Sequence, residues 1–375
     1  MLATSGLRTV GAVQPEPLAT DAALADESPQ PTGLPVDWAL AARTAARLLP
    51  PGPVVTPEEA LASVQRLRAD AVVAETHVRA VTGLGEGTPL LAADVMDRPG
   101  WVRAAVHGMS ALTAGASLPL PSPAAHRFAT TTAGLQLGAV LGFLGTRVLG
   151  QYDPFGGADG NGRLALVAPN VVAAQQALNV PLDDFGLWVC LHEATHRLQF
   201  TAVPWLREYF SNEVSQFLTV SEASAAGMLE RLPTALRVAR QSGGDSAALI
   251  ELLQGPEQRL VLDRLLAMIT LLEGHADHVM DAVGPSVVPT VATIRERFTA
   301  RRRGGGLVER LLRALLGVEA KVRQYAIGAK FTRYVVDEVG MGGFNKVWTS
   351  PETLPSRSEL ANPTAWLERV APAKA

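Results

Sequence analysis

Apolar residues recur along most of the chain with the three-and-four spacing of α-helices. The clearest helix start is at Thr56, which suits the N-cap, with Pro57 in the first turn and Glu59 completing a capping box. Glycine and proline mark most of the helix ends. The helices predicted from this pattern cover residues 36–49, 56–81, 93–115, 183–201, 211–241, 257–283 and 307–340. The predicted fold class is therefore mainly α.

A different pattern occupies residues 146–170. Short strand-like runs at 147–152 and 163–168 flank a glycine-rich loop, whose Asp-Gly and Asn-Gly pairs are typical of hairpins. The loop lacks the Lys-Ser/Thr pair of a phosphate-binding P-loop. We predict a small β-element here, and we interpret residues 164–167 as an edge strand that can pair with an extended peptide.

Composition divides the chain into a tail and two domains. Residues 1–35 are rich in Pro, Ala, Thr, Asp and Glu and show no sustained period, which predicts a disordered tail. Three prolines between residues 119 and 123 form a rigid connection. We therefore predict an N-terminal helical domain over 36–123 and a second domain over 124–375.

The longest uncharged stretch, residues 128–146, contains Gly134, Gly138 and Gly142. Its length would allow a bilayer span, but it also holds Thr130, Thr131, Thr132 and Gln136. Glycines four residues apart allow a helix to approach a neighbour very closely. We favour a closely packed helix of a globular domain.

The overall composition narrows the class of protein. Hydrophobic residues make up 47% and charged residues 18%, which is typical of ordered globular proteins. A net charge of -3 gives no general attraction to nucleic acid or to an anionic membrane. The N-terminus shows no signal-peptide pattern, so the cytoplasm is the expected location. Cys190 is the single cysteine, which excludes an internal disulfide, and its apolar surroundings predict an inert core thiol.

The candidate chemistry begins with His192, Glu193 and His196 in an apolar predicted helix. Residues four apart share one helix face, so the two imidazoles can hold one Zn²⁺ ion. Glu193 is next to this face, where it can take a proton from water without occupying the metal. The alternative reading is a pair of core histidines that bind backbone carbonyls.

A second segment supplies further ligands. Glu273 and Asp277 are four residues apart on a predicted helix and can face the same neighbour. We predict Glu273 as the third, carboxylate ligand, and Asp277 as the acceptor for the free imidazole N–H of a ligand histidine. Three protein ligands leave one position for water, as catalytic zinc sites do. His275 or His278 remains an alternative to Glu273.

Several segments together resemble a known family. They are residues 191–200, 272–277, 321–325, 345–348, 351–355 and 363–367. They resemble the Glu-ligand, gluzincin-like branch of the zincin metallopeptidases. The resemblance is closer to a poorly characterised zincin-like family labelled as associated with deazaflavin-cofactor biosynthesis in actinobacteria. It extends over roughly residues 36–370, and it implies a zincin-like helical metallopeptidase architecture with residues 124–375 as the metal-binding domain.

The residues and the resemblance together predict a zinc-dependent hydrolase, specifically a metallopeptidase that acts on a peptide or protein. Glu193 is the predicted general base, and zinc polarises the scissile carbonyl. The tetrahedral oxyanion needs a second donor. The family-like segment implies Tyr325 and Arg323 for this role, while His275 and His278 are alternatives.

Two other functions compete with this prediction. One is a binding or regulatory protein that retains a zinc site without hydrolysis. It is favoured by Arg197, where the general zinc-peptidase pattern has an uncharged residue, and by the long gap between His196 and Glu273. The other is a di-iron bundle, but this requires a second Glu-x-x-His unit, which residues 257–283 lack.

Overall fold

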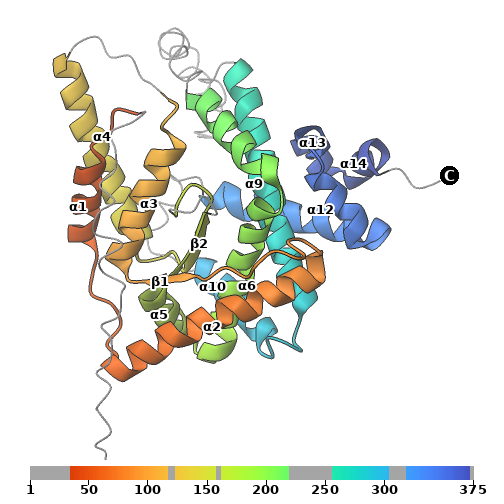
Figure 1. Ribbon diagram of the computed structural model, residues 1–375, viewed down its shortest axis with the longest axis horizontal. Coiled ribbons are helices and arrows are strands. Elements are labelled where there is room, and N and C mark those ends of the chain that lie inside the picture. The colour runs from red at the N-terminus through yellow and green to blue at the C-terminus, as the bar shows by residue number, and fades with distance from the viewer. Residues whose placement is uncertain (1–33, 117–122, 158–161, 219–255, 304–317, 372–375) are drawn as a thin grey trace, which may run out of the picture.

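The computed structural model describes residues 34–116, 123–157, 162–218, 256–303 and 318–371, and Figure 1 shows them as a mostly helical molecule with one small sheet. The helices are α1 (Trp38–Leu48), α2 (Pro57–Thr82), α3 (Arg98–Leu112), α4 (Pro123–Leu144), α5 (Ala168–Leu178), α6 (Leu182–Thr201), α9 (Pro256–Val283), α10 (Val291–Arg303), α12 (Val318–Phe344), α13 (Arg357–Ala361) and α14 (Pro363–Val370). The strands are β1 (Asp94–Met96), β2 (Gly150–Asp153) and β3 (Arg163–Val167), and two 3-10 helices are η1 (Asn345–Trp348) and η2 (Pro351–Thr353). The predicted fold class, mainly α with a small β-element, is confirmed.

The sheet has the strand order β1-β3-β2, with β1 parallel and β2 antiparallel to β3. The prediction that residues 164–167 form an edge strand is wrong, because β3 is the central strand. Its side chains alternate between two hydrophobic clusters: Leu164 and Leu166 belong to one, Ala165 and Val167 to the other. A strand buried on both faces loses the apolar-polar alternation that would have distinguished it. The strand beside the candidate site is β2.

The helix predicted over residues 93–115 is also partly wrong. Residues 94–96 form β1, and α3 begins only at Arg98. Asp97 separates the two elements, since its side chain accepts a hydrogen bond of 2.7 Å from the backbone N–H of Gly100 and caps the helix. Three residues of strand are too short to interrupt a helical period in the sequence.

The other predicted helices divide into those confirmed and those only partly described. α6 and α9 confirm the helices predicted over 183–201 and 257–283. Residues 204–218 are helical, so that segment starts earlier than the predicted residue 211. Residues 219–255 and 304–317 lie outside the described part of the chain, as does nearly all of the predicted tail.

The metal-motif helix α6 lies at the centre of the larger hydrophobic cluster. It packs against α2 on one side and α9 on another (Figure 1). Phe185, Leu191 and Ala194 are completely buried. Cys190 is buried in the same cluster, 3.9 Å from the carbonyl oxygen of Leu67, and burial raises the pKa of its thiol well above the usual range. This confirms the inert core thiol.

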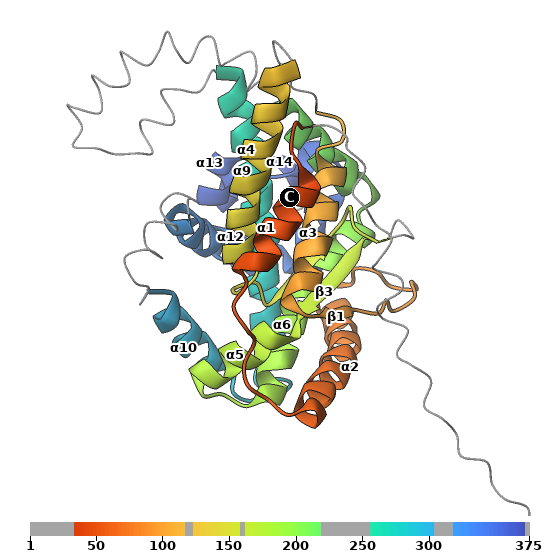
Figure 2. The ribbon, with the colours of Figure 1, turned by 90° about the vertical axis from the view of Figure 1, so that its left-hand side faces the viewer.

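The smaller hydrophobic cluster contains residues of α1, α3 and α4, which lie side by side in Figure 2. These helices pack on the face of the sheet opposite to the larger cluster. The glycines of α4 make this packing possible: a Cβ at Gly138 would lie 2.8 Å from the carbonyl oxygen of Ala41, and one at Gly134 2.7 Å from that of Asp37. The closely packed helix is confirmed. Among the described helices, none combines the length and apolarity needed to cross a bilayer. The division of the chain at residue 123 stays a prediction.

The α1–α4 contact gives a stability prediction. Gly138→Ala is expected to lower the free energy of unfolding by about 1–3 kcal/mol, because the new methyl overpacks the interface against α1. Gly342→Ala is the matched control, since a Cβ there meets no atom within 4 Å. Urea unfolding of both variants checks this, and equal midpoints would contradict the close packing.

Candidate metal centre

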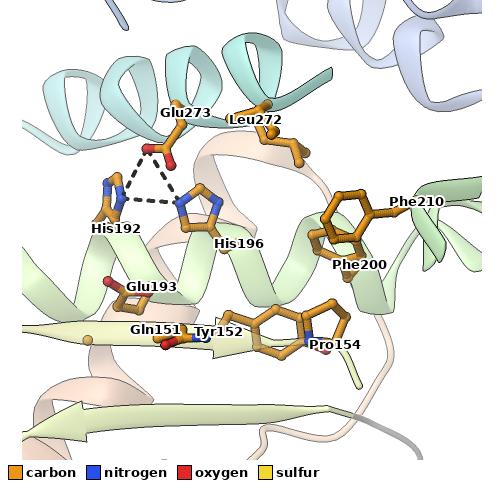
Figure 3. Close-up of a pocket in the computed structure, with 12 residues that line it drawn as sticks. Gln151, Tyr152, Pro154, His192, Glu193, His196, Phe200, Phe210, Leu272 and Glu273 are labelled. Atoms are coloured by element: carbon orange, nitrogen blue, oxygen red, sulfur yellow. Dashed lines mark hydrogen bonds and ion pairs between the residues drawn. The ribbon is translucent and has the colours of Figure 1, made fainter. Parts of the chain in front are cut away.

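Two helices bring three candidate ligands together. α6 presents His192 and His196 one turn apart, with their Nε2 atoms 3.1 Å from each other. α9 places Glu273 opposite them: its Oε2 is 3.5 Å from Nε2 of His192 and 3.8 Å from Nε2 of His196. Figure 3 shows the three side chains converging on one point between the helices. The predicted ligands are therefore adjacent in space, although Glu273 is far from the histidines in sequence.

The separations within this group fit a single zinc ion. A tetrahedral zinc with bonds of about 2.0–2.1 Å holds neighbouring ligand atoms about 3.3 Å apart. The three separations, 3.1, 3.5 and 3.8 Å, lie close to that value. In the described part of the chain, these residues form the one group of three or more His, Cys, Asp or Glu that could hold a metal ion. Two imidazoles and one carboxylate are also the ligand types of hydrolytic zinc sites.

Glu193 lies on a different side of α6, facing β2 (Figure 3). A Cβ at position 150 would be 2.6 Å from the Cγ of Glu193, so glycine there allows the strand backbone to approach the carboxyl group. The pKa of Glu193 is raised to about 7, mainly by burial; the charge of His196 and a hydrogen bond from the backbone N–H of Tyr152 oppose this rise, and the charge of Glu273 adds to it. A carboxyl group with this pKa can take up and release a proton near neutral pH.

An open pocket of about 300 Å³ adjoins these residues. Its polar side contains His192, Glu193, His196 and Glu273, together with the backbone of β2. Its apolar wall consists of Tyr152, Pro154, Phe200, Phe210, Ile269 and Leu272. The rings of Tyr152 and Phe200 are 5.9 Å apart and those of Phe200 and Phe210 6.3 Å, so the wall includes a continuous aromatic surface.

Comparisons with known proteins agree with this geometry. Residues 36–367 match the model of the zincin-like metallopeptidases. The chain belongs to the zincin-like metallopeptidase family. A crystal structure from Chloroflexus aurantiacus, described as "a putative hydrolase with a novel fold", has a TM-score of 0.66 and 29% sequence identity, covering 90% of this chain and 100% of that one. A search of curated proteins finds no match.

Membership of the zincin-like family and the His-His-Glu group support a zinc-dependent hydrolase. In the structure, Glu273 lies in this group, whereas the two alternative histidines, His275 and His278, do not. His275 is completely buried, its Nδ1 lies 3.0 Å from Nε2 of Gln199, and burial lowers its pKa to about 3. Burial also lowers the pKa of His278, and the nearby charge of Arg333 lowers it further. Neither histidine is part of the group that could hold a metal.

Arg197, the departure from the usual zinc-peptidase pattern, has a structural role in this zincin-like protein. It is almost completely buried, and its guanidinium donates to Glu75 at 2.7 Å and to the carbonyl oxygens of Leu91 and Ala92. Glu75, also fully buried, accepts from Arg79 on its own helix at 2.5 Å. This ionic network ties α6 to α2 and to the segment that leads into β1.

Asp277 lies one turn after Glu273 on α9. Its carboxylate is 3.6 Å from the guanidinium of Arg295, which also donates to the backbone carbonyl of Asp277 at 3.1 Å. That Asp277 accepts a hydrogen bond from a ligand histidine stays a prediction. So do the roles of Arg323 and Tyr325: both belong to α12, but their side chains lie outside the described residues.

Two features of the site were missed by reasoning from the sequence. The first is the approach of β2 to Glu193 at Gly150, which follows from tertiary packing and leaves no local signal. The second is Gln199, a completely buried residue whose side-chain oxygen lies 2.9 Å from Nδ1 of His196. Its position three residues after His196, on the same helix face, was a visible signal.

Proposed function

We propose that this protein is a zinc peptidase in which His192, His196 and Glu273 hold the metal and Glu193 is the general base. The observation that carries the proposal is the arrangement of these residues: the His-His-Glu group and the buried carboxyl group of Glu193 line the same open pocket beside β2. Zinc bound there would polarise the scissile carbonyl and lower the pKa of a water molecule.

The protein's own residues would move the protons. Glu193 accepts a proton from the attacking water and later delivers it to the leaving amine. The backbone N–H of Tyr152 donates a hydrogen bond to the carboxylate of Glu193 and holds it in place. Tyr325 and Arg323 remain our candidates for the second donor to the oxyanion; α12, which carries them, packs against α9.

The substrate we propose is an extended peptide segment with a large apolar side chain near the scissile bond. β2 is an edge strand, and its residues Gly150, Gln151 and Tyr152 line the pocket, so an extended chain can add to the sheet there. The aromatic wall formed by Phe200 and Phe210 offers an apolar surface to one side chain of that segment. A connection with deazaflavin-cofactor biosynthesis stays a prediction from the resemblance.

Metal content tests the ligand set. Purified wild type is expected to contain about one zinc per chain by elemental analysis, and Glu273→Ala to lose most of it, because two imidazoles alone hold zinc weakly. Glu257→Ala is the matched control: it removes an exposed carboxylate from the same helix and should leave the zinc in place. Wild type that stays free of zinc after reconstitution would contradict the proposal.

A further inference from the structure

Gln199 connects the two halves of the ligand group through its side-chain amide. Its Oε1 lies 2.9 Å from Nδ1 of His196. Its Nε2 lies 2.9 Å from the carbonyl oxygen of Leu272 and 3.0 Å from Nδ1 of His275. Leu272 directly precedes Glu273, so the amide of a single buried side chain reaches His196 on α6 and the backbone next to Glu273 on α9.

The partners of this amide allow one orientation. The backbone carbonyl of Leu272 can only accept a hydrogen bond, so the amide N–H₂ of Gln199 must face it. The amide oxygen then faces Nδ1 of His196, and because this oxygen can only accept, Nδ1 of His196 must carry the proton. In a neutral imidazole the other nitrogen, Nε2, is then left with its lone pair, and it is Nε2 that faces His192 and Glu273.

We propose that Gln199 is a positioning residue that fixes His196 in the tautomer able to bind metal and ties it to the backbone next to Glu273. The proposal rests on the metal site proposed above. Hydrogen bonds from a ligand histidine to a neighbouring acceptor orient the ring and increase its basicity as a ligand. Here that acceptor also donates to α9, so the orientation of the ring and the spacing of the two helices depend on the same side chain.

The competing explanation is that Gln199 merely satisfies buried polar groups between α6 and α9. Three variants separate the two. Gln199→Met removes both the acceptor and the donors at similar size. Gln199→Glu keeps an acceptor for His196 but loses the amide donors to Leu272 and His275. His275→Phe removes one partner of the amide and leaves the bond between Gln199 and His196 in place.

Zinc affinity, measured by competition with a chelating dye, gives the first readout. Gln199→Met is expected to bind zinc about 10–100-fold more weakly than wild type. Gln199→Glu keeps the acceptor for His196 but not the donor to Leu272, so it is expected to lose clearly less zinc affinity than Gln199→Met. His275→Phe is expected to stay within a few-fold of wild type even where its unfolding midpoint falls. Unchanged affinity in Gln199→Met, or an equal loss in all three variants, would overturn the positioning role.

The tautomer gives a second readout that needs no metal. Spectra of the metal-free protein labelled with ¹⁵N-histidine, at mildly alkaline pH, are expected to show His196 protonated at Nδ1, with its signals assigned from His196→Asn. In Gln199→Met the same ring is expected to shift toward the Nε2-protonated form. An Nε2-protonated His196 in wild type would overturn this inference whatever the zinc content, whereas wild type without zinc would overturn the proposed function and leave the tautomer result standing.

Discussion

Glu193→Gln is expected to lower kcat/KM for peptide hydrolysis by about 10²–10⁴-fold while zinc remains bound. The amide keeps the size of the side chain but cannot accept the proton of the attacking water. Because burial disfavours the charged form of Glu193, the variant is expected to unfold no more easily than wild type. The measurement is the hydrolysis of a quenched-fluorescent peptide library, with zinc content and unfolding midpoint determined on the same samples.

The pH dependence gives this experiment its internal control. Glu193 must be ionised to act as a base, so kcat/KM is expected to fall as the pH drops below the pKa of this group. That pKa is about 7 without metal, raised by burial, and a zinc cation nearby would lower it. The acid limb is therefore expected at or below about pH 7, and residual activity of Glu193→Gln should lack it.

Hydrolysis at the wild-type rate in the variant would show that another group is the base. A zinc-loaded wild type that hydrolyses no peptide would instead favour the binding or regulatory alternative.

The second large effect is expected at Glu75. Glu75→Gln is expected to lower the free energy of unfolding by about 3–5 kcal/mol, because it leaves the buried guanidinium of Arg197 without its counter-charge. Urea unfolding followed by circular dichroism measures the change.

The same pair of helices supplies a matched control for Glu75→Gln. Arg66 on α2 and Asp183 on α6 form an ion pair at 2.7 Å, but 46% and 66% of their side chains are exposed. Arg66→Gln is therefore expected to change the free energy of unfolding by less than about 1 kcal/mol. Similar losses in the two variants would show that the Arg197–Glu75–Arg79 network contributes no more than a surface ion pair.

The part of the candidate site that could be predicted best is the part whose signals are local. His192 and His196 are placed on one face by helical spacing alone, and the apolar residues around Glu273 indicated that its helix is buried. Helical spacing alone could not show that Glu273 lies next to the two histidines. It depends on the packing of α6 against α9, which joins segments far apart in the chain.

The errors have a common physical cause. β1 is three residues long, and β3 is buried on both faces, so neither shows the alternation that identifies strands and edges in a sequence. The structural role of Arg197 was missed because its partner, Glu75, lies on a distant helix. A buried charge is recognisable as structural only when its counter-charge is known.

The contact between Gly150 and Glu193 bears on how the relatives of this protein can be sorted. Position 150 has no room for a side chain unless the strand or the carboxyl group moves. The three candidate metal ligands do not share this constraint, so a chain could keep two histidines and a glutamate while losing the close approach of β2 to the carboxyl group of Glu193. We therefore expect the residue aligned with Gly150 to separate family members that preserve the strand-to-carboxyl geometry from those that keep the two histidines and the glutamate without it.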